Sequence, residues 1–269
     1  MKKFKKLAML VLAGTLAVSM LAGCGSKEKS GSNSGKEKFV LGLDDAFPPM
    51  GFRDDDNNIV GFDIDVATEV CKRLDWELEL KPISWEAKEQ ELNTGSITCI
   101  WNGLSINDER KEKMLLSDAY MTNNQVAVVL ADSDMENIED LKGKKVVIQN
   151  GSTASDAVEA DAEFAKSLGE LVRVDNNVTA MMDLQTGGSD AVVMDEVVAR
   201  YYMEKDDNKG KFKLLDGTLL EEQYAIAFKK GNTETCDKVN ATLKEMAKDG
   251  KLAEISKKWF GSDITIIEK

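Results

Sequence analysis

The chain has 269 residues, a formal net charge of −13 and no histidine. An acidic surface repels phosphate backbones, which argues against a nucleic-acid partner. The absence of histidine removes the commonest general base and metal ligand, and this weakens most hypotheses of enzyme activity or of a metal site. We expect no cofactor.

The amino terminus has the parts of a secretory signal with a lipid-attachment site. Four lysines lie within the first six residues, and an apolar run at 7–22 leads into the box Leu21-Ala22-Gly23-Cys24. The run is shorter than the roughly 20 residues that usually span a bilayer, so an uncleaved membrane anchor fits less well. We predict that residues 1–23 are a signal peptide and that Cys24 is lipidated, which would hold the protein outside the cytoplasm at the membrane.

Residues 24–37 are rich in glycine, serine and charged side chains. No residue between 25 and 35 could seed a core, so this segment is predicted to be a flexible tether. A tether of this kind lets a folded body move near the membrane while acyl chains hold it there. The folded body should begin near Lys38.

The first part of the folded body alternates predicted strands and helices. In chain order these are a strand at 39–43, a helix at 63–74, a strand at 77–82, a helix at 86–93, a strand at 97–101, a helix at 108–114 and a strand at 125–130. Strands that alternate with helices predict an α/β fold with a largely parallel sheet.

The alternation then restarts, which predicts a second lobe. Its elements are a strand at 145–149, a helix at 155–168, a strand at 171–174, a helix at 180–186, a strand at 191–194 and a helix at 196–203. A strand at 224–229 and helices at 233–249 and 252–260 are expected to pack back on the first lobe.

We therefore predict two lobes joined by two crossing segments, near 122–125 and 221–224. Lobe 1 consists of residues 38–122 and 224–269, and lobe 2 of residues 123–223. A cleft between two lobes is a favoured ligand site.

The predicted body contains three cysteines besides Cys24. Cys71, Cys99 and Cys236 have a spacing that resembles no metal site. We expect buried free thiols, with a disulfide between Cys71 and Cys99 as the alternative in an exported protein.

The most specific motif of the chain is Gly61-Phe62-Asp63-Ile64-Asp65-Val66-Ala67. It resembles the signature of the family 3 solute-binding proteins of polar amino acid ABC importers. Residues 42–49, 103–110, 151–153 and 190–195 are similar to further motifs of that family, in the family's order. The resemblance covers about residues 38–261. It implies a two-lobed clamshell of the type II periplasmic-binding-protein kind, which closes on a free amino acid and docks on ABC permease subunits.

Polar residues at the ends of predicted strands independently favour a site between the lobes. Open α/β sheets bind ligands at the carboxyl ends of their strands. The residues at or just after such ends are Asp44, Asn102, Gly103, Ser105, Ser152, Thr153 and Asp195.

The resemblance implies how these residues would hold an amino acid. Arg110 would bind the carboxylate through its planar guanidinium fork, with Ser152 and Thr153 beside it at a helix amino end. Asp195 would accept the ammonium group, with the neighbours Ser105 and Gly103. Phe47 would stack on the ligand or cover it.

Each assignment has a structural alternative. Arg110 lies in a highly charged segment that is also typical of a solvated helix face. Ser152, Thr153 and Asp195 are also typical helix caps. Asp63 and Asp65 match the signature, but they fit partners of a helix dipole better, so we interpret them as structural.

The sequence leaves two classes of ligand side chain open, cationic and neutral polar. Asp44, Asp45 and Glu86 would form an acidic subsite for arginine or lysine if they converge, and we favour this interpretation. Trp101, Asn102 and Phe47 would instead suit glutamine, cystine or another neutral residue.

The leading hypothesis is a monomeric binding protein without enzyme activity. One alternative is an enzyme of the dehydratase type, with Asp44, Glu86 and Asp195 as candidate acids but no histidine to support them. Another is a sensor subunit that reports the amino acid to a membrane receptor.

Overall fold

The computed structural model describes residues 35–268. The predicted signal peptide, Cys24 and most of the predicted tether lie outside this range. From Lys36 on, the chain forms a single unit by its internal contacts. Within residues 35–268, none of the helices has both the length and the apolar character that crossing a bilayer would require.

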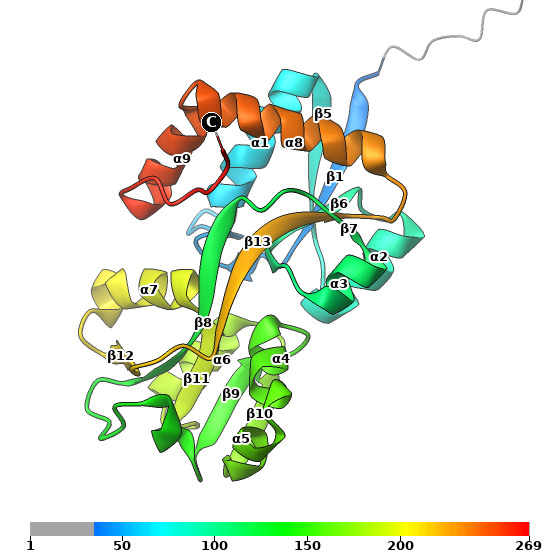
Figure 1. Cartoon of the computed structure of the whole chain (residues 1–269). Coiled ribbons are helices and arrows are strands. Elements are labelled where there is room, and N and C mark those ends of the chain that lie inside the picture. Colours follow the sequence, from blue (N-terminus) through cyan, green and yellow to red (C-terminus); the bar gives the residue numbers. More distant parts are fainter. Residues whose placement is uncertain (1–34, 269) are drawn as a thin grey trace, which may run out of the picture. The chain divides into compact units, whose positions relative to one another are not determined.

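The first lobe is built on three parallel strands in the order β5-β1-β6. They are β1 (Glu37–Leu43), β5 (Trp76–Pro82) and β6 (Cys99–Ser105). All seven residues of β6 are buried, as expected for a strand that is covered on both faces. Helices α1 (Phe62–Leu74), α2 (Lys88–Thr94), α3 (Asp108–Lys113), α8 (Thr233–Lys248) and α9 (Lys251–Phe260) surround these strands (Figure 1).

The second lobe repeats this arrangement with the parallel order β10-β9-β11. The strands are β9 (Lys145–Gln149), β10 (Glu170–Val174) and β11 (Ala191–Asp195). Helices α4 (Thr153–Ala160), α5 (Ala162–Ser167), α6 (Asn177–Gln185) and α7 (Glu196–Glu204) accompany them. The periodic apolar pattern of the sequence therefore predicted the type and order of the main elements in both lobes.

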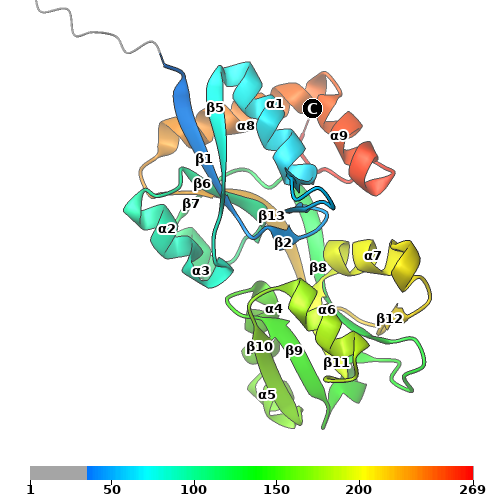
Figure 2. The same ribbon diagram turned by 180° about the vertical axis from the view of Figure 1, so that it is seen from behind.

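Two long antiparallel strands connect the lobes (Figures 1 and 2). They are β8 (Met121–Leu130) and β13 (Leu220–Phe228). At one end Tyr224 of β13 is paired with Ser105 of β6. At the other end Gln125 of β8 is paired with Asp195 of β11. The crossing strands thus bring the carboxyl ends of β6 and β11 to the same place.

Some elements differ from the sequence-based expectation. Strand β6 runs two residues later at its start and four at its end than the predicted strand, so Asn102, Gly103 and Ser105 lie within it rather than after it. The predicted helix at 155–168 is divided into α4 and α5, because Asp161 caps a new helix by accepting from the amides of Glu163 and Phe164. The described chain also contains short strands that the sequence pattern did not predict: β2 (Ala46–Phe47), β3 (Gly51–Arg53), β4 (Ile59–Val60), β7 (Leu115–Leu116) and β12 (Phe212–Leu214).

The signature motif forms the start of α1. Gly61 precedes the helix with φ 147°, and a Cβ atom there would lie 2.2 Å from the carbonyl oxygen of Met50. Only glycine fits such an approach. The first residue of the helix, Phe62, is fully buried, and Val66 and Val70 continue the same apolar face. The interpretation of Phe62 and the following apolar stripe as core is confirmed.

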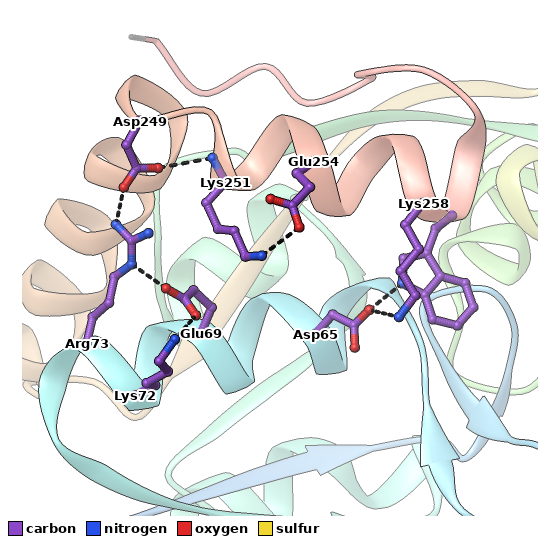
Figure 3. Close-up of polar contacts among 9 residues, drawn as sticks. Asp65, Glu69, Lys72, Arg73, Asp249, Lys251, Glu254 and Lys258 are labelled. Atoms are coloured by element: carbon purple, nitrogen blue, oxygen red, sulfur yellow. Dashed lines mark hydrogen bonds and ion pairs between the residues drawn. The ribbon is translucent and has the colours of Figure 1, made fainter.

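Helices α8 and α9 return to the first lobe and pack on α1. Ion pairs join these helices (Figure 3). Arg73 of α1 bonds Asp249 at 2.7 Å and Glu69 at 2.8 Å, while Lys258 of α9 bonds Asp65 at 2.6 Å. The expectation that the carboxyl-terminal helices pack on the first lobe is confirmed.

Cys71, Cys99 and Cys236 are buried and free. Burial raises the pKa of the Cys71 thiol to about 12, so the thiol stays protonated at neutral pH. The prediction of buried free thiols is confirmed, and the alternative disulfide between Cys71 and Cys99 is not formed.

Candidate functional site

A small cavity lies between the lobes where β6 and β11 end. Its wall consists of Phe47, Trp85, Gly103, Ser105, Arg110, Gln149, Ser152, Thr153 and Asp195. Seven of these were predicted from the sequence, and Trp85 and Gln149 were missed. The free volume is only ≈ 10 Å³, about enough for one water molecule. The lobes are therefore closed, and they must part to admit anything larger.

Arg110 is the buried residue of an otherwise exposed helix. Helix α3 begins after Asn107, whose side chain caps it by accepting from the Arg110 amide at 2.8 Å. The guanidinium group turns inward and donates to the carbonyl of Ser105 at 2.7 Å. Only 5% of Arg110 is exposed, so the alternative of a solvated helix face is wrong for this residue.

The second lobe contributes the amino end of α4. Ser152 caps this helix by accepting from the Ser155 amide, and its hydroxyl donates to the carbonyl of Gln149 at 2.7 Å. The hydroxyl of Thr153 lies 3.2 Å from that of Ser105 in the other lobe. Capping by Ser152 therefore coexists with a position in the cavity wall, and the positive end of the helix dipole points toward the cavity.

Asp195 is the last residue of β11 and precedes α7. Its side chain does not cap that helix. Instead, its carboxylate accepts from the amide of Asn123 at 2.8 Å and from the hydroxyl of Tyr224 at 2.7 Å. Burial, and then the neighbouring carboxyl of Glu222, raise the pKa of Asp195 to about 8. The capping alternative for Asp195 is wrong.

Glu222 is a buried acid that sequence reasoning missed. It lies on β13, and its Oε1 accepts from Ser105 at 2.7 Å, Asn123 at 2.7 Å and Gln125 at 2.8 Å. Its Oε2 is buried and has no hydrogen-bond partner in the described part of the chain. The sequence signal that could have identified Glu222 is the presence of an acidic residue inside the predicted crossing segment 221–224.

Asp44 lies just behind the cavity and bridges the lobes. The amide of Gln149 donates to its carboxylate at 2.7 Å, and its own backbone amide donates to Asn102 at 3.1 Å. Burial raises the pKa of Asp44 to about 6. Asp44 and Asn102 are therefore not part of the cavity wall in the closed form, but Asp44 contacts one wall residue directly.

The predicted acidic subsite does not assemble as expected. Asp45 turns away from the cavity and pairs with Arg53 at 2.6 Å. Glu86 is exposed, because the 3-10 turn Trp85–Ala87 directs Trp85 into the cavity and leaves Glu86 outside. Glu86 lines a second pocket of ≈ 550 Å³, which shares Arg110 with the cavity. Of the three acids, only Asp44 remains near the site, and Trp101 is fully enclosed in the core.

Gly103 is held by the signature helix and lies close to the ring of Phe47. Gly103 has φ 58°, and a Cβ atom there would approach the ring of Phe47 to 2.9 Å. The Gly103 amide donates to Asp63 at 2.8 Å, and Tyr120 donates to the same carboxylate oxygen at 3.0 Å. Asp63 therefore fixes the backbone of Gly103 in the cavity wall, which is consistent with its interpretation as a structural residue.

Two further contacts close the rim of the cleft. The ammonium group of Lys88, a residue that is 4% exposed, donates to the carbonyl of Gly151 at 2.9 Å. The side chain of Asn107 donates to Asp156 at 3.1 Å. The sequence analysis missed Lys88 because it follows Glu86 in an ordinary charged segment.

Within residues 35–268, no three cysteine or acidic side chains are grouped so that they could hold a metal ion. The cavity instead joins a buried guanidinium, a helix amino end and a buried carboxylate. Such groups can bind a molecule that carries both a carboxylate and an ammonium group.

Residues 39–262 match the family described as bacterial extracellular solute-binding proteins, family 3. The chain belongs to this family. One relative, the arginine-binding extracellular protein ArtP of Bacillus subtilis, is 32% identical over 95% of this chain and 98% of that protein. Another, the L-cystine-binding protein TcyJ of Escherichia coli K12, is 30% identical over 98% of this chain and 99% of that protein.

A solved structure of similar fold comes from Streptococcus pneumoniae. It is a substrate-binding protein of an ABC uptake transporter with bound histidine. It is 35% identical, covers 85% of this chain and 94% of its own, and superposes with a TM-score of 0.82. The predicted family and the two-lobed α/β fold with two crossing segments are confirmed. The roles of the individual site residues and the lobe boundaries stay predictions.

Proposed function

We propose that this family 3 solute-binding protein captures a polar amino acid between its lobes and delivers it to an ABC permease. The observation that carries the proposal is the pairing of buried Arg110 with buried Asp195 in the wall of one closed cavity. A guanidinium group and an acid in one small site match the carboxylate and the ammonium group of an amino acid. Two relatives are named as arginine-binding and L-cystine-binding proteins. These names support an amino acid as the class of ligand.

In this proposal the carboxylate is bound by Arg110 together with Ser152 and Thr153 at the amino end of α4. The ammonium group is bound by Asp195, with the hydroxyl of Ser105 and the carbonyl of Gly103 beside it.

The two aromatic residues of the wall, Phe47 and Trp85, cover the ligand. The ligand contacts both lobes at once, so it stabilises the closed form that the permease recognises. We assign residues 38–122 and 224–269 to lobe 1 and residues 123–223 to lobe 2.

For the side chain of the ligand we favour arginine or lysine. Asp44 is the acid next to the cavity, and a ligand cation would supply the counter-charge that its buried carboxylate lacks. Glutamine and cystine are the alternative class, because amide and aromatic groups also surround the site.

We further propose that the protein is a monomer anchored outside the cytoplasm through lipid on Cys24. The lysine-rich start, the apolar run and the Leu21-Ala22-Gly23-Cys24 box support this anchor. The chemistry of the site calls for binding alone, without turnover.

A thermal-shift panel tests the ligand class. The purified body, residues 36–269, is heated with each of the twenty amino acids, ornithine and cystine. A ligand that binds only the folded state raises the melting temperature, by an amount that grows with its concentration. We expect the largest shift with arginine, lysine or ornithine. If only glutamine or cystine raises the melting temperature, the ligand is neutral and the proposal of a cationic ligand is wrong. If no amino acid raises it, the proposed function is refuted.

A further inference from the structure

Two carboxyl groups lie side by side at the crossing strands. Asp195 ends β11 and is 5% exposed, and Glu222 lies on β13 and is 9% exposed. One amide group joins them, because the nitrogen of Asn123 donates to Asp195 at 2.8 Å and to Glu222 at 2.7 Å. The proposed zwitterion site accounts for Asp195 but leaves Glu222 without a role.

The surroundings of this pair contain many neutral donors and few charges. Ser105, Gln125 and Asn123 donate to Glu222. The hydroxyl group of Tyr224 donates a hydrogen bond to the carboxyl group of Asp195.

The charge of Arg110 on α3 interacts first with Asp156 of α4, and then with Glu222 and Asp195. Other charges near the pair are engaged elsewhere. Glu196, the next residue after Asp195, accepts from Asn124 and Arg200, and Lys88 is bonded to Gly151. Two buried acids therefore face one guanidinium group.

Two neighbouring carboxylates in a buried site cannot both ionise cheaply, so such a pair retains a proton. The raised pKa of Asp195, about 8, agrees with this expectation. An ammonium group that enters the site would take over the role of that proton as the local positive charge.

We propose that Glu222 is the second acid of the ammonium subsite, and that the α-ammonium group of the ligand displaces a proton shared by Asp195 and Glu222. The inference rests on the proposed function, because it requires an amino acid whose ammonium group reaches Asp195. No covalent bond changes except the O–H bond that releases the proton.

The proton has a short path to solvent. A groove of ≈ 430 Å³ over the crossing strands is lined by both Asn123 and Glu222. Glu222 therefore lines the outer groove and bonds Ser105 of the inner cavity wall, and it acts as a positioning residue through its charge on Asp195.

The pH dependence has a definite sign. In the closed structure without ligand, Asp195 has a pKa of about 8 and holds its proton below about that pH. In the complex the ammonium group stabilises the carboxylate of Asp195, so the pKa of Asp195 falls. Protons therefore compete with the ligand at low pH, and the affinity rises by up to about tenfold per pH unit between pH 6 and pH 8.

Titration calorimetry tests this proton release. Arginine, glutamine and cystine are each titrated into the protein at pH 7 in phosphate and in Tris, which differ in heat of ionisation. We expect about one proton released per bound amino acid. Glu222→Gln should release less than the unmodified protein and should depend less on pH from 6 to 8, because only burial, the larger cause, then raises the pKa of Asp195. The glutamine keeps the oxygen that accepts from Ser105, Asn123 and Gln125, so the fold should persist.

Glu221→Gln is the matched control. Glu221 is the preceding residue of the same strand and is exposed, so this variant should release a proton as the unmodified protein does. If Glu222→Gln does not fold, the proton count of the unmodified protein still tests whether the ammonium group displaces a proton, and binding without release would overturn the inference.

The outcomes separate the two proposals. Binding without proton release in the unmodified protein, or equal release by Glu222→Gln, would overturn the role of Glu222 and leave the proposed function intact. The absence of binding by any amino acid would instead overturn the proposed function, and the inference with it.

Discussion

At the residue scale, burial distinguishes Arg110 from the other charged residues of its helix. We expect Arg110→Lys to weaken binding of the cognate amino acid at least about tenfold, because lysine keeps the charge but loses the planar fork. Calorimetry measures the change. Lys111→Arg is the control, since Lys111 is exposed on the same helix and this exchange should leave the affinity unchanged. Equal affinities of Arg110→Lys and the unmodified protein would remove Arg110 from the site.

Asp44 and Asp45 are adjacent in the chain but differ in surroundings. Asp44→Asn should reduce the affinity for arginine or lysine by well over tenfold and barely affect glutamine, because a desolvated charge pair is worth about 2–5 kcal/mol. Asp45→Asn should leave both affinities unchanged, since Asp45 pairs with Arg53 at the surface. Calorimetry with arginine and with glutamine compares the variants. A similar loss for both ligands would contradict the role of Asp44 as a counter-charge.

At the scale of elements, the signature motif supplies two acids to the first turn of α1. Asp63→Ala should lower the free energy of unfolding by at least about 2 kcal/mol, because the amide of Gly103 and the hydroxyl of Tyr120 lose their buried acceptor. Asp65→Ala should cost no more than about 1 kcal/mol, because its pair with Lys258 is partly exposed (Figure 3).

Denaturant unfolding of the ligand-free proteins measures both values. The Asp63 variant should also bind amino acids more weakly, because Gly103 lies in the cavity wall. Equal stabilities of the two variants would mean that Asp63 does not tie α1 to β6.

At the scale of the whole molecule, the anchor depends on one residue. Cys24→Ser should prevent lipidation and release the protein from membranes, which cell fractionation followed by immunoblotting detects. Cys236→Ser, a change inside the folded body, should leave the protein with the membranes. Recovery of the Cys24 variant in the membrane fraction at the level of the unmodified protein would refute the lipoprotein prediction.

The sequence by itself determined the type and order of the main elements and the family. These features are local: apolar periodicity sets each helix and strand, and the motif around Gly61 depends on a backbone approach that only glycine permits. Five wall residues were also predictable, because the carboxyl ends of the strands meet at one edge of each lobe: Gly103, Ser105, Ser152, Thr153 and Asp195. Phe47 and Arg110 were predicted from the family resemblance.

Only the tertiary structure decided which neighbours in the chain face the cavity. Trp85 points inward while Glu86 points outward, and Asp44 bonds Gln149 while Asp45 bonds Arg53. These directions depend on turn geometry and on partners up to about a hundred residues away.

Glu222 is the clearest case of such a decision. Its partner Ser105 lies 117 residues away in the chain. No local pattern marks an acid on a crossing strand as buried, because its burial depends on side chains of β6 and β8 that are distant in the chain. The physical reason is that charge and burial at this site are properties of the assembled lobes, whereas periodicity and motifs are properties of short segments.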